Sequence, residues 1–437
     1  MPDQRCATAL IATWLLCSLL STSHTLAEPS ADQVDAREST MPSWSQFIKG
    51  IEALPEQMLA KLSPVQRNDP LIREEVTRLA LAALTSSALD TLGSDPLHPV
   101  FLPSIGQILS VGQPNADTVY RVARIHPEGI YRLRGKRGSL ALFNLSESPP
   151  KPGEPGFEPA LMRQPGARPR HDFAELSVDH DDRFDVVLSQ QRPAGYNGDW
   201  WPLAPTTHNL LLRMVSADWD KERAPTISIE RLDTPVRRSR ASAAELAERM
   251  RRLPQSSAFI GGLLIDRVNQ MRARGLVNQL QPVDMAGLGG LRRQHFFEGA
   301  YDITEEEALI IETPVPATCG YYSLLLTNPL YETTDWYNNQ SSLNHTQSEI
   351  DDDGVLRIVV SGRDPGVLNW LDTAGYPTGS IQGRWESCDS QPTPTVTRVR
   401  LSALEQQLPP RTPRMSSKER EQRIRHRRQQ LQQRPLW

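Results

Sequence analysis

The spacing of hydrophobic residues along the chain changes from a helical to a strand-like period and back. Asp69-Pro70 suits a helix start, because aspartate caps a first turn and proline tolerates the next position. Apolar residues from Ile72 to Leu84 then fall on one stripe, which predicts a helical region over 40–95. Ser242, with Glu245 three residues later, begins a helical connector over 240–280. A second helix of this connector is predicted from about Ser256 to Arg274.

Two other regions carry the short β-rich runs that are typical of strands. The first covers 96–235 and contains a proline-rich loop over 146–170, followed by a predicted strand over 173–178. The second covers 292–402. The sequence therefore predicts an α+β fold dominated by β-structure, with two β-sandwich or jelly-roll-like regions and short helices before, between and after them.

The first 27 residues have the pattern of a secretory signal peptide. An almost uncharged apolar run extends from Ala7 to Leu20, and Thr25 and Ala27 stand where a small-residue cleavage site expects them. The run is short for a bilayer span, which needs about 20 apolar residues, although an uncleaved anchor is the alternative. No later stretch is apolar enough to span a membrane. We therefore expect a bacterial protein that is periplasmic or secreted.

Two of the four cysteines, Cys6 and Cys17, would leave with the signal. Cys319 and Cys388 remain, both at ends of predicted strands. In an oxidising compartment they are a plausible disulfide, and two buried free thiols are the alternative.

The charge of the chain is concentrated at its C-terminus. The whole chain has a formal net charge of −4, but the segment from Arg411 to Trp437 has nine Arg or Lys and two Glu, which leaves −11 for the rest. A tail helix is predicted within 410–437, capped by Ser416, and it is polar on all sides. Such a helix is exposed or binds something, such as the acidic body of the protein or an anionic surface. Nucleic acid is not expected as a partner of an exported protein.

Three motifs in the last third resemble the family called domain of unknown function 1214. They are Ser342–His345, the run Asp364–Gly375 and Gly383–Trp385. Upstream, Asn115–Thr118 resembles a motif of the associated family, domain of unknown function 1254. The resemblance implies a β-sandwich or jelly roll that is often exported, but no accepted substrate and no agreed catalytic residues. Leu368 departs from the pattern, where proline is expected.

The Asp364–Gly375 run is the first candidate for chemistry. Asp364 and Asp372 beside Trp370 and Asn369 resemble the paired carboxylates and aromatic platform that glycoside hydrolysis uses. The alternative is that both aspartates cap turns and Trp370 belongs to the core.

His345 is a second candidate, as a general base near Glu349 or Asp351, although a lone histidine in a turn is more often only solvated. The acidic run from Glu349 to Gly354 imitates half of a calcium loop. The twelfth position is Val360 instead of glutamate, so no metal site is expected.

Arg124 could receive an anionic group, but an ion pair with Asp117 or Glu128 is the alternative. Trp200 and Trp201 are adjacent, and in an extended segment they point to opposite sides. One of them is therefore expected to face solvent, a ligand or another subunit.

No phosphate-binding Gly-Lys loop, nucleophile elbow or zinc-binding helix motif occurs, and no cofactor is expected. The first functional hypothesis is an envelope protein that binds a small molecule or glycan, or assembles into a homo-oligomer. The second is a glycan-directed hydrolase that uses Asp364 and Asp372.

Overall fold

The computed structural model describes residues 42–106, 109–151, 154, 156–158, 160, 169–285 and 294–435. The predicted signal peptide and a large part of the proline-rich loop lie outside these residues. The described chain forms four β-sheets and a layer of helices, which confirms the α+β, β-dominated fold. No helix among the described residues combines the length and hydrophobicity that crossing a bilayer requires.

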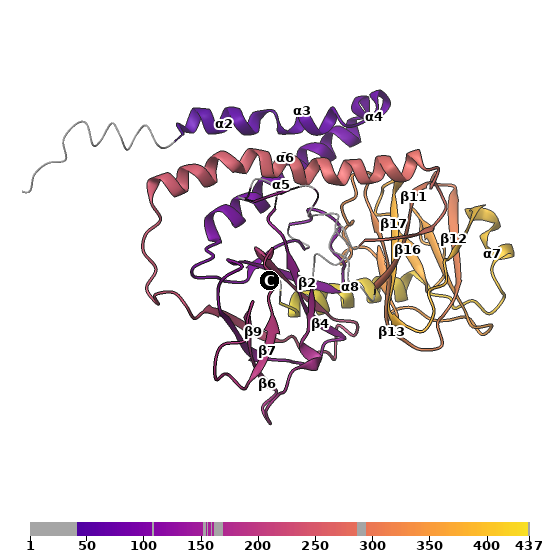
Figure 1. The fold of residues 1–437 in the computed structure, drawn as a ribbon. Helices are drawn as coiled ribbons and strands as arrows, with labels where there is room; N and C mark the ends of the chain where they lie inside the picture. Colours follow the sequence, from indigo (N-terminus) through magenta and orange to yellow (C-terminus); the bar gives the residue numbers. More distant parts are fainter. Residues whose placement is uncertain are drawn as a thin grey trace, which may run out of the picture.

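Helices from two parts of the chain form one layer over the sheets (Figure 1). The layer comprises α2 (Trp44–Glu52), α3 (Leu54–Leu59), α4 (Pro64–Asn68), α5 (Pro70–Gly93) and α6 (Ala243–Ala273). Asp69 caps α5 as predicted, since its side chain accepts a hydrogen bond from the Leu71 amide at 2.9 Å.

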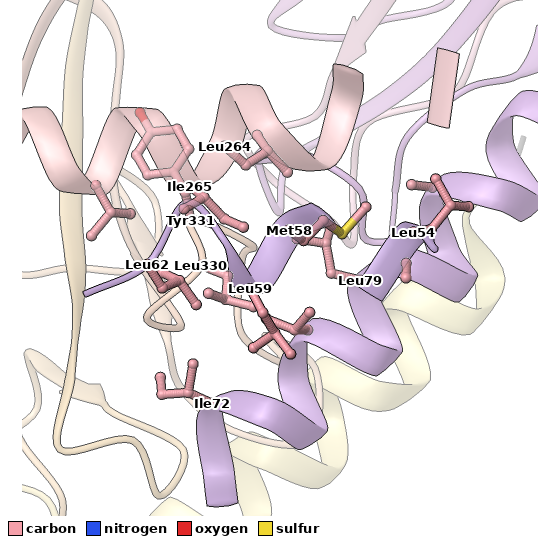
Figure 2. Packing of buried hydrophobic residues seen from close by; sticks show 14 of the residues in the cluster. Leu54, Met58, Leu59, Leu62, Ile72, Leu79, Leu264, Ile265, Leu330 and Tyr331 are labelled. Carbon is pink, nitrogen blue, oxygen red and sulfur yellow. The ribbon is translucent and has the colours of Figure 1, made fainter. Parts of the chain in front are cut away.

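The core of this layer includes residues from the second β-region. Figure 2 shows Met58, Leu79 and Ile265 from three helices packed together with Leu330 and Tyr331. Leu330 and Tyr331 belong to the loop after strand β13 (Cys319–Thr327). The loop thus fixes the helical layer to the second β-region.

The connector is one helix, so the prediction of a separate second helix from Ser256 was wrong. α6 continues through Pro254, which packs on Gly50 of α2. A Cβ on Gly261 would overlap the Met58 side chain, so glycine lets α3 approach α6 closely. Packing of this kind outweighs the low helix propensity of proline and glycine.

The first sandwich pairs a five-stranded sheet, in the order β1-β2-β8-β4-β5, with a four-stranded sheet, in the order β7-β6-β3-β9. Its strands are β1 (Leu102–Pro103), β2 (Thr118–Arg124), β3 (Tyr131–Lys136), β4 (Leu142–Ser148), β5 (Arg170–Asp172), β6 (Arg183–Ser189), β7 (Asp199–Pro202), β8 (Asn209–Val215) and β9 (Thr226–Arg231). Its core contains Tyr131, Leu145 and Leu212.

The strand predicted over 173–178 was wrong, because Phe173–Glu175 forms a 3₁₀ turn. Asp172 accepts a hydrogen bond from the Ala174 amide at 3.0 Å, and this cap ends β5.

The second sandwich repeats this architecture with sheets β10-β11-β17-β13-β14 and β16-β15-β12-β18. Its strands are β10 (Gln281–Val283), β11 (Gln294–Asp302), β12 (Glu307–Pro314), β13, β14 (Ser342–Asn344), β15 (Val355–Ser361), β16 (Trp370–Asp372), β17 (Thr378–Cys388) and β18 (Thr395–Arg400). Cys319 and Cys388 are directly opposite in the β13–β17 ladder and are joined by a disulfide.

Two helices follow the last strand, α7 (Leu404–Gln407) and α8 (Ser417–Gln433). In Figure 1, α8 passes from the second sandwich towards the first. Ser416 and Glu419 form its predicted capping box.

Candidate functional site

The outer face of the five-stranded sheet in the second sandwich is polar and nevertheless buried. On β17, Ile381 and Trp385 point into the second core. The alternate residues Gln382, Arg384 and Glu386 point to the opposite face, yet each is at least nine-tenths buried. An antiparallel sheet usually leaves such a polar face in water, so this one is covered by other parts of the protein.

Two contacts show that this face lies against the five-stranded sheet of the first sandwich. Tyr321 of β13 packs with Val215 and Leu142 of the first sandwich. Arg170 of β5 donates to Glu386 at 3.2 Å, and Tyr321 pairs with Glu386 across the β13–β17 ladder.

Asn144 stands between these two contacts. Along β4, it is two residues from Leu142 and two from Ser146, which pairs with Arg170. Asn144 therefore lies opposite the Tyr321 and Glu386 pair, on the same face as its neighbours. We call this region the inter-sheet surface. Its members are Asn144, Ser146, Arg170, Arg213, Tyr321, Ser323, Arg384 and Glu386.

Asp117 joins the two sandwiches at one end of the inter-sheet surface. Its Oδ2 accepts a hydrogen bond from the Tyr321 hydroxyl at 2.6 Å, and its Oδ1 accepts from the Asn344 amide at 2.9 Å. Within its own sandwich, Oδ1 also accepts from the Trp219 indole at 2.8 Å. Asn115 donates to the Tyr321 hydroxyl at 2.7 Å. The segments 115–118 and 342–345, which are more than 200 residues apart, thus form one buried hydrogen-bond network.

The ionisation states at this network follow from burial. Burial, and then the charge of Asp117, raises the pKa of Tyr321 well above its usual value, so the phenol keeps its proton and donates it to the carboxylate. Burial lowers the pKa of His345, so this imidazole is neutral at pH 7. His345 lies beside Tyr321 with ring centroids 5.9 Å apart. Its catalytic role stays a prediction.

The tail helix inserts arginines along the junction of the sandwiches. Arg420 donates to Gln340 at 2.8 Å, and Arg427 donates to the Trp336 carbonyl at 2.8 Å. Beyond the end of α8, Arg434 donates to the Asp117 carbonyl at 2.7 Å, and its guanidinium lies 5.1 Å from the centre of the Trp219 ring. The basic tail therefore binds the body of its own chain.

The Asp364 and Asp372 carboxylates form turn contacts. Asp364 accepts from the Gly366 amide at 2.9 Å and from Arg420 at 3.1 Å. Asp372 accepts from the Ala374 amide at 2.8 Å. Burial raises the pKa of Asp372, and Asp364 adds to this effect. These contacts favour the turn-capping alternative over a carboxylate pair that faces a substrate.

The neighbours of these aspartates are also held within the fold. Trp370 is buried and donates to the Ser361 carbonyl at 3.1 Å. Asn369 donates to the carbonyls of Glu349 and Arg357 and accepts from the Glu349 amide. Neither side chain is free to bind a ligand in this arrangement.

The adjacent tryptophans point to opposite sides of β7. Trp201 is buried in the first core and stacks on His171 with ring centroids 4.8 Å apart. Trp200 is half-buried on the outer face, where it donates to Ser189 at 3.0 Å. An open groove of about 970 Å³ is formed nearby by residues of β3, β6 and β9 and includes Asp199, next to Trp200.

Arg124 forms ion pairs, but with other partners than those expected. It contacts Asp90 at 2.8 Å and also Glu154, where Asp117 or Glu128 was predicted.

The acidic run near Glu349 also forms ion pairs within the fold. Asp351 and Asp353 both bind Arg357, at 2.9 and 2.8 Å.

One group of possible metal ligands occurs in the part of the chain that the structure describes: Asp179, His180 and Asp181. Asp179 already accepts from the amides of Asp181 and Arg183 at 2.9 Å. This surface turn gives no ground for assigning a metal.

Sequence reasoning missed most of the inter-sheet surface. One signal was available on β17, where polar residues alternate with Ile381, Gly383 and Trp385. Sequence reasoning assigned no functional motif to Asn144, Ser323 or Glu386. Their place at the interface became visible only from the strands that pack against them.

Comparison with solved structures gives a similar fold without a function. An uncharacterised protein from Burkholderia cenocepacia superposes with a TM-score of 0.74 at 26% identity, covering 82% of this chain and 97% of that one. A protein from Vibrio parahaemolyticus matches with a TM-score of only 0.42 at 11% identity, covering 80% and 100%. No family model and no curated protein matches the chain.

Proposed function

We propose that this protein is an exported, non-catalytic ligand-binding protein of the bacterial envelope. The proposal rests chiefly on one observation, which is that the second sandwich buries the polar face of a sheet against the first sandwich. Buried polar groups cost free energy unless they find partners, and an apolar interface of the same size would hold two domains together better. Ligand sites use a few placed polar groups to orient what they bind, and this surface offers such groups.

The apolar run at 7–20 and the disulfide between Cys319 and Cys388 support export. The motifs at 342–345 and 364–375 support distant membership of the domain of unknown function 1214 family. A carbohydrate-like ligand agrees with the hydroxyl, amide and guanidinium groups of the inter-sheet surface.

The test is a thermal-shift panel on the chain without residues 1–27. The panel contains neutral sugars, glycan fragments, lipids, small acids and metal ions. A ligand that binds only the folded state stabilises it by about 2.7 kcal/mol at a hundredfold excess over Kd. One reproducible rise in melting temperature, confirmed by calorimetric titration, supports the proposal.

A flat panel with a cooperatively unfolding protein would contradict ligand binding. The assembly hypothesis then becomes the leading one, and light scattering of the same sample decides it by the molar mass in solution.

A further inference from the structure

Exposed apolar side chains gather on the helical layer. Among the described residues, every large apolar side chain that is exposed, apart from Ile350, belongs to this layer or to the segments 94–100 and 232–242 beside it. The described strands of the two sandwiches keep their large apolar side chains inside or half-buried. Single exposed apolar residues are ordinary, but their concentration on one part of a surface marks a site of interaction.

One end of the layer, where α2 and α6 begin and α5 ends, brings several of these side chains together (Figure 1). Arg249 of α6 donates to the Ser94 carbonyl at 2.9 Å, which joins the start of α6 to the end of α5. Thr234 donates to the Leu97 carbonyl at 3.1 Å, which joins the segment before α6 to the segment after α5. These contacts use polar and backbone atoms, so they leave the apolar side chains of both segments outside.

The apolar side chains at this end extend into solvent. The exposed fractions are 70% for Trp44, 70% for Leu92, 51% for Leu97 and 90% for Val236. We call this surface the layer end. Its members are Trp44, Leu92, Leu97, Leu232, Val236, Arg237 and Arg240.

The segment that leads into α6 is basic. Residues 231–252 contain seven arginines and three acidic residues, although the chain outside its C-terminal tail is acidic. Arg238 is neutralised by Asp95 at 2.8 Å. Arg237 and Arg240 are exposed, and neither forms an ion pair with another described residue. Two free guanidinium groups therefore stand next to the exposed apolar side chains.

This combination of side chains fits an anionic lipid surface. Tryptophan settles at the headgroup level of a bilayer, exposed leucine and valine enter the boundary of the acyl chains, and arginine is attracted to anionic headgroups. The chain also enters the fold at this end, because α2 follows the apolar run at 7–20 in the sequence. A second copy bound through the same face would bring two sets of arginines together, which like-charge repulsion disfavours.

We infer that the layer end docks on an anionic phospholipid surface. Leu92, Leu97 and Val236 enter the headgroup region, while Arg237 and Arg240 bind the lipid phosphates. This inference goes beyond the proposed function, because membrane contact at this end uses no residue of the inter-sheet surface.

The experiment measures binding of the chain without residues 1–27 to lipid vesicles by co-sedimentation. One set of vesicles is phosphatidylcholine alone, and the other contains about one-third phosphatidylglycerol. Binding is expected to be at least tenfold tighter on the anionic vesicles. It is also expected to weaken as the salt concentration rises, because salt screens exposed charges.

Two double variants test the two parts of the layer end separately. Arg237→Gln with Arg240→Gln is expected to weaken binding to the anionic vesicles at least tenfold. Leu97→Ser with Val236→Ser is expected to weaken it by a similar factor, because less apolar surface leaves water. Val65→Ser is the matched control, since Val65 is 82% exposed on α4 at the opposite end of the layer, and it leaves the affinity unchanged (Figure 1).

All of these side chains are exposed, so each variant is expected to melt at the wild-type temperature. Absence of binding to both kinds of vesicle overturns the inference, as does equal binding to neutral and anionic vesicles. Wild-type affinity in both double variants, or an equal loss in Val65→Ser, also overturns it, because binding then occurs elsewhere. Light scattering tests the other occupant, and a dimer that both double variants abolish would make the layer end an interface between copies. The ligand panel of the proposed function is a separate measurement and is decided by its own result.

Discussion

Tyr321 in the second sandwich donates its hydroxyl proton to the carboxylate of Asp117 in the first, with 2.6 Å between the two oxygens. Both residues are buried, and Asn115 donates to the same hydroxyl. The relative position of the sandwiches is therefore specified by a charge-assisted hydrogen bond, which is stronger and more directional than a neutral one.

We expect Tyr321→Phe to lower the free energy of unfolding by about 1–3 kcal/mol, because it removes the hydrogen-bond partner of Asp117 Oδ2 and of the Asn115 side-chain NH2 group. Tyr322→Phe is the matched control. Among the described residues, the Tyr322 hydroxyl bonds only to the neutral Ser348 hydroxyl at 3.2 Å, so the loss there is below about 1 kcal/mol. Urea unfolding of the two variants measures both values. Equal losses would contradict the special role of the Asp117 contact.

Glu332 connects pH to the stability of the helical layer. It is fully buried beside Glu75, and Arg78 and Asn328 bind both carboxylates. Tyr376 donates to the other oxygen of Glu75 at 2.9 Å. Burial, and more weakly the charge of Glu75, raises the pKa of Glu332 to about 7.

A raised carboxyl pKa means that the folded protein binds this proton more tightly than the unfolded chain. The Glu332 contribution is therefore fully present below about pH 4.5 and is lost as pH rises through 7. Glutamine does not titrate, so Glu332→Gln does not lose this contribution. As pH rises from 5 to 8, the unfolding free energy of the variant is therefore expected to increase by roughly 2–3 kcal/mol relative to that of the wild type. Denaturant unfolding at both pH values measures the difference, and a wild-type-like pH dependence in the variant would sink the assignment.

The tail helix should stabilise the body through its buried arginines only. Arg427 donates to the Trp336 carbonyl, Ser342 and Gln347, so Arg427→Met leaves these acceptors unpaired and costs about 2–4 kcal/mol. Arg425→Met is the control on the same helix. Arg425 is exposed and, within the part of the chain that the structure describes, pairs only with Glu421, a contact that contributes less than about 0.5 kcal/mol. Similar melting temperatures for the two variants would argue against a docked tail in solution.

Asp364→Asn separates the turn-capping role from the catalytic one. Asparagine keeps the bond to the Gly366 amide but weakens the pairing with the buried Arg420. We expect the melting temperature to fall by several degrees. A variant with wild-type stability that has lost a glycan-hydrolysing activity would instead support the hydrolase hypothesis.

The adjacent tryptophans provide a test of orientation within β7. Trp201→Ala removes a buried ring from the first core and is expected to cost about 3–5 kcal/mol. Trp200→Ala, on the outer face, should cost less than about 1 kcal/mol. Circular-dichroism melts of the two variants compare their losses of stability. A larger loss for Trp200→Ala than for Trp201→Ala would show that Trp200, not Trp201, points into the core.

Periodicity and capping chemistry determined the local elements of this protein. Asp69 predicted the start of α5, the alternation along 96–235 and 292–402 predicted two β-regions, and adjacent tryptophans predicted one outward ring. These properties depend on neighbours a few residues away, so a sequence carries them.

Tertiary structure alone decided where the polar surfaces meet. It fused the connector into α6 by packing Pro254 on Gly50 and Gly261 on Met58, and it directed the arginines of the tail into the junction of the sandwiches. Asn144 and Glu386 are ordinary polar strand residues by sequence, and they are buried only because the opposite sheet covers them. The free energy of a polar group depends on what surrounds it, and for these residues the surroundings come from strands about 240 positions away.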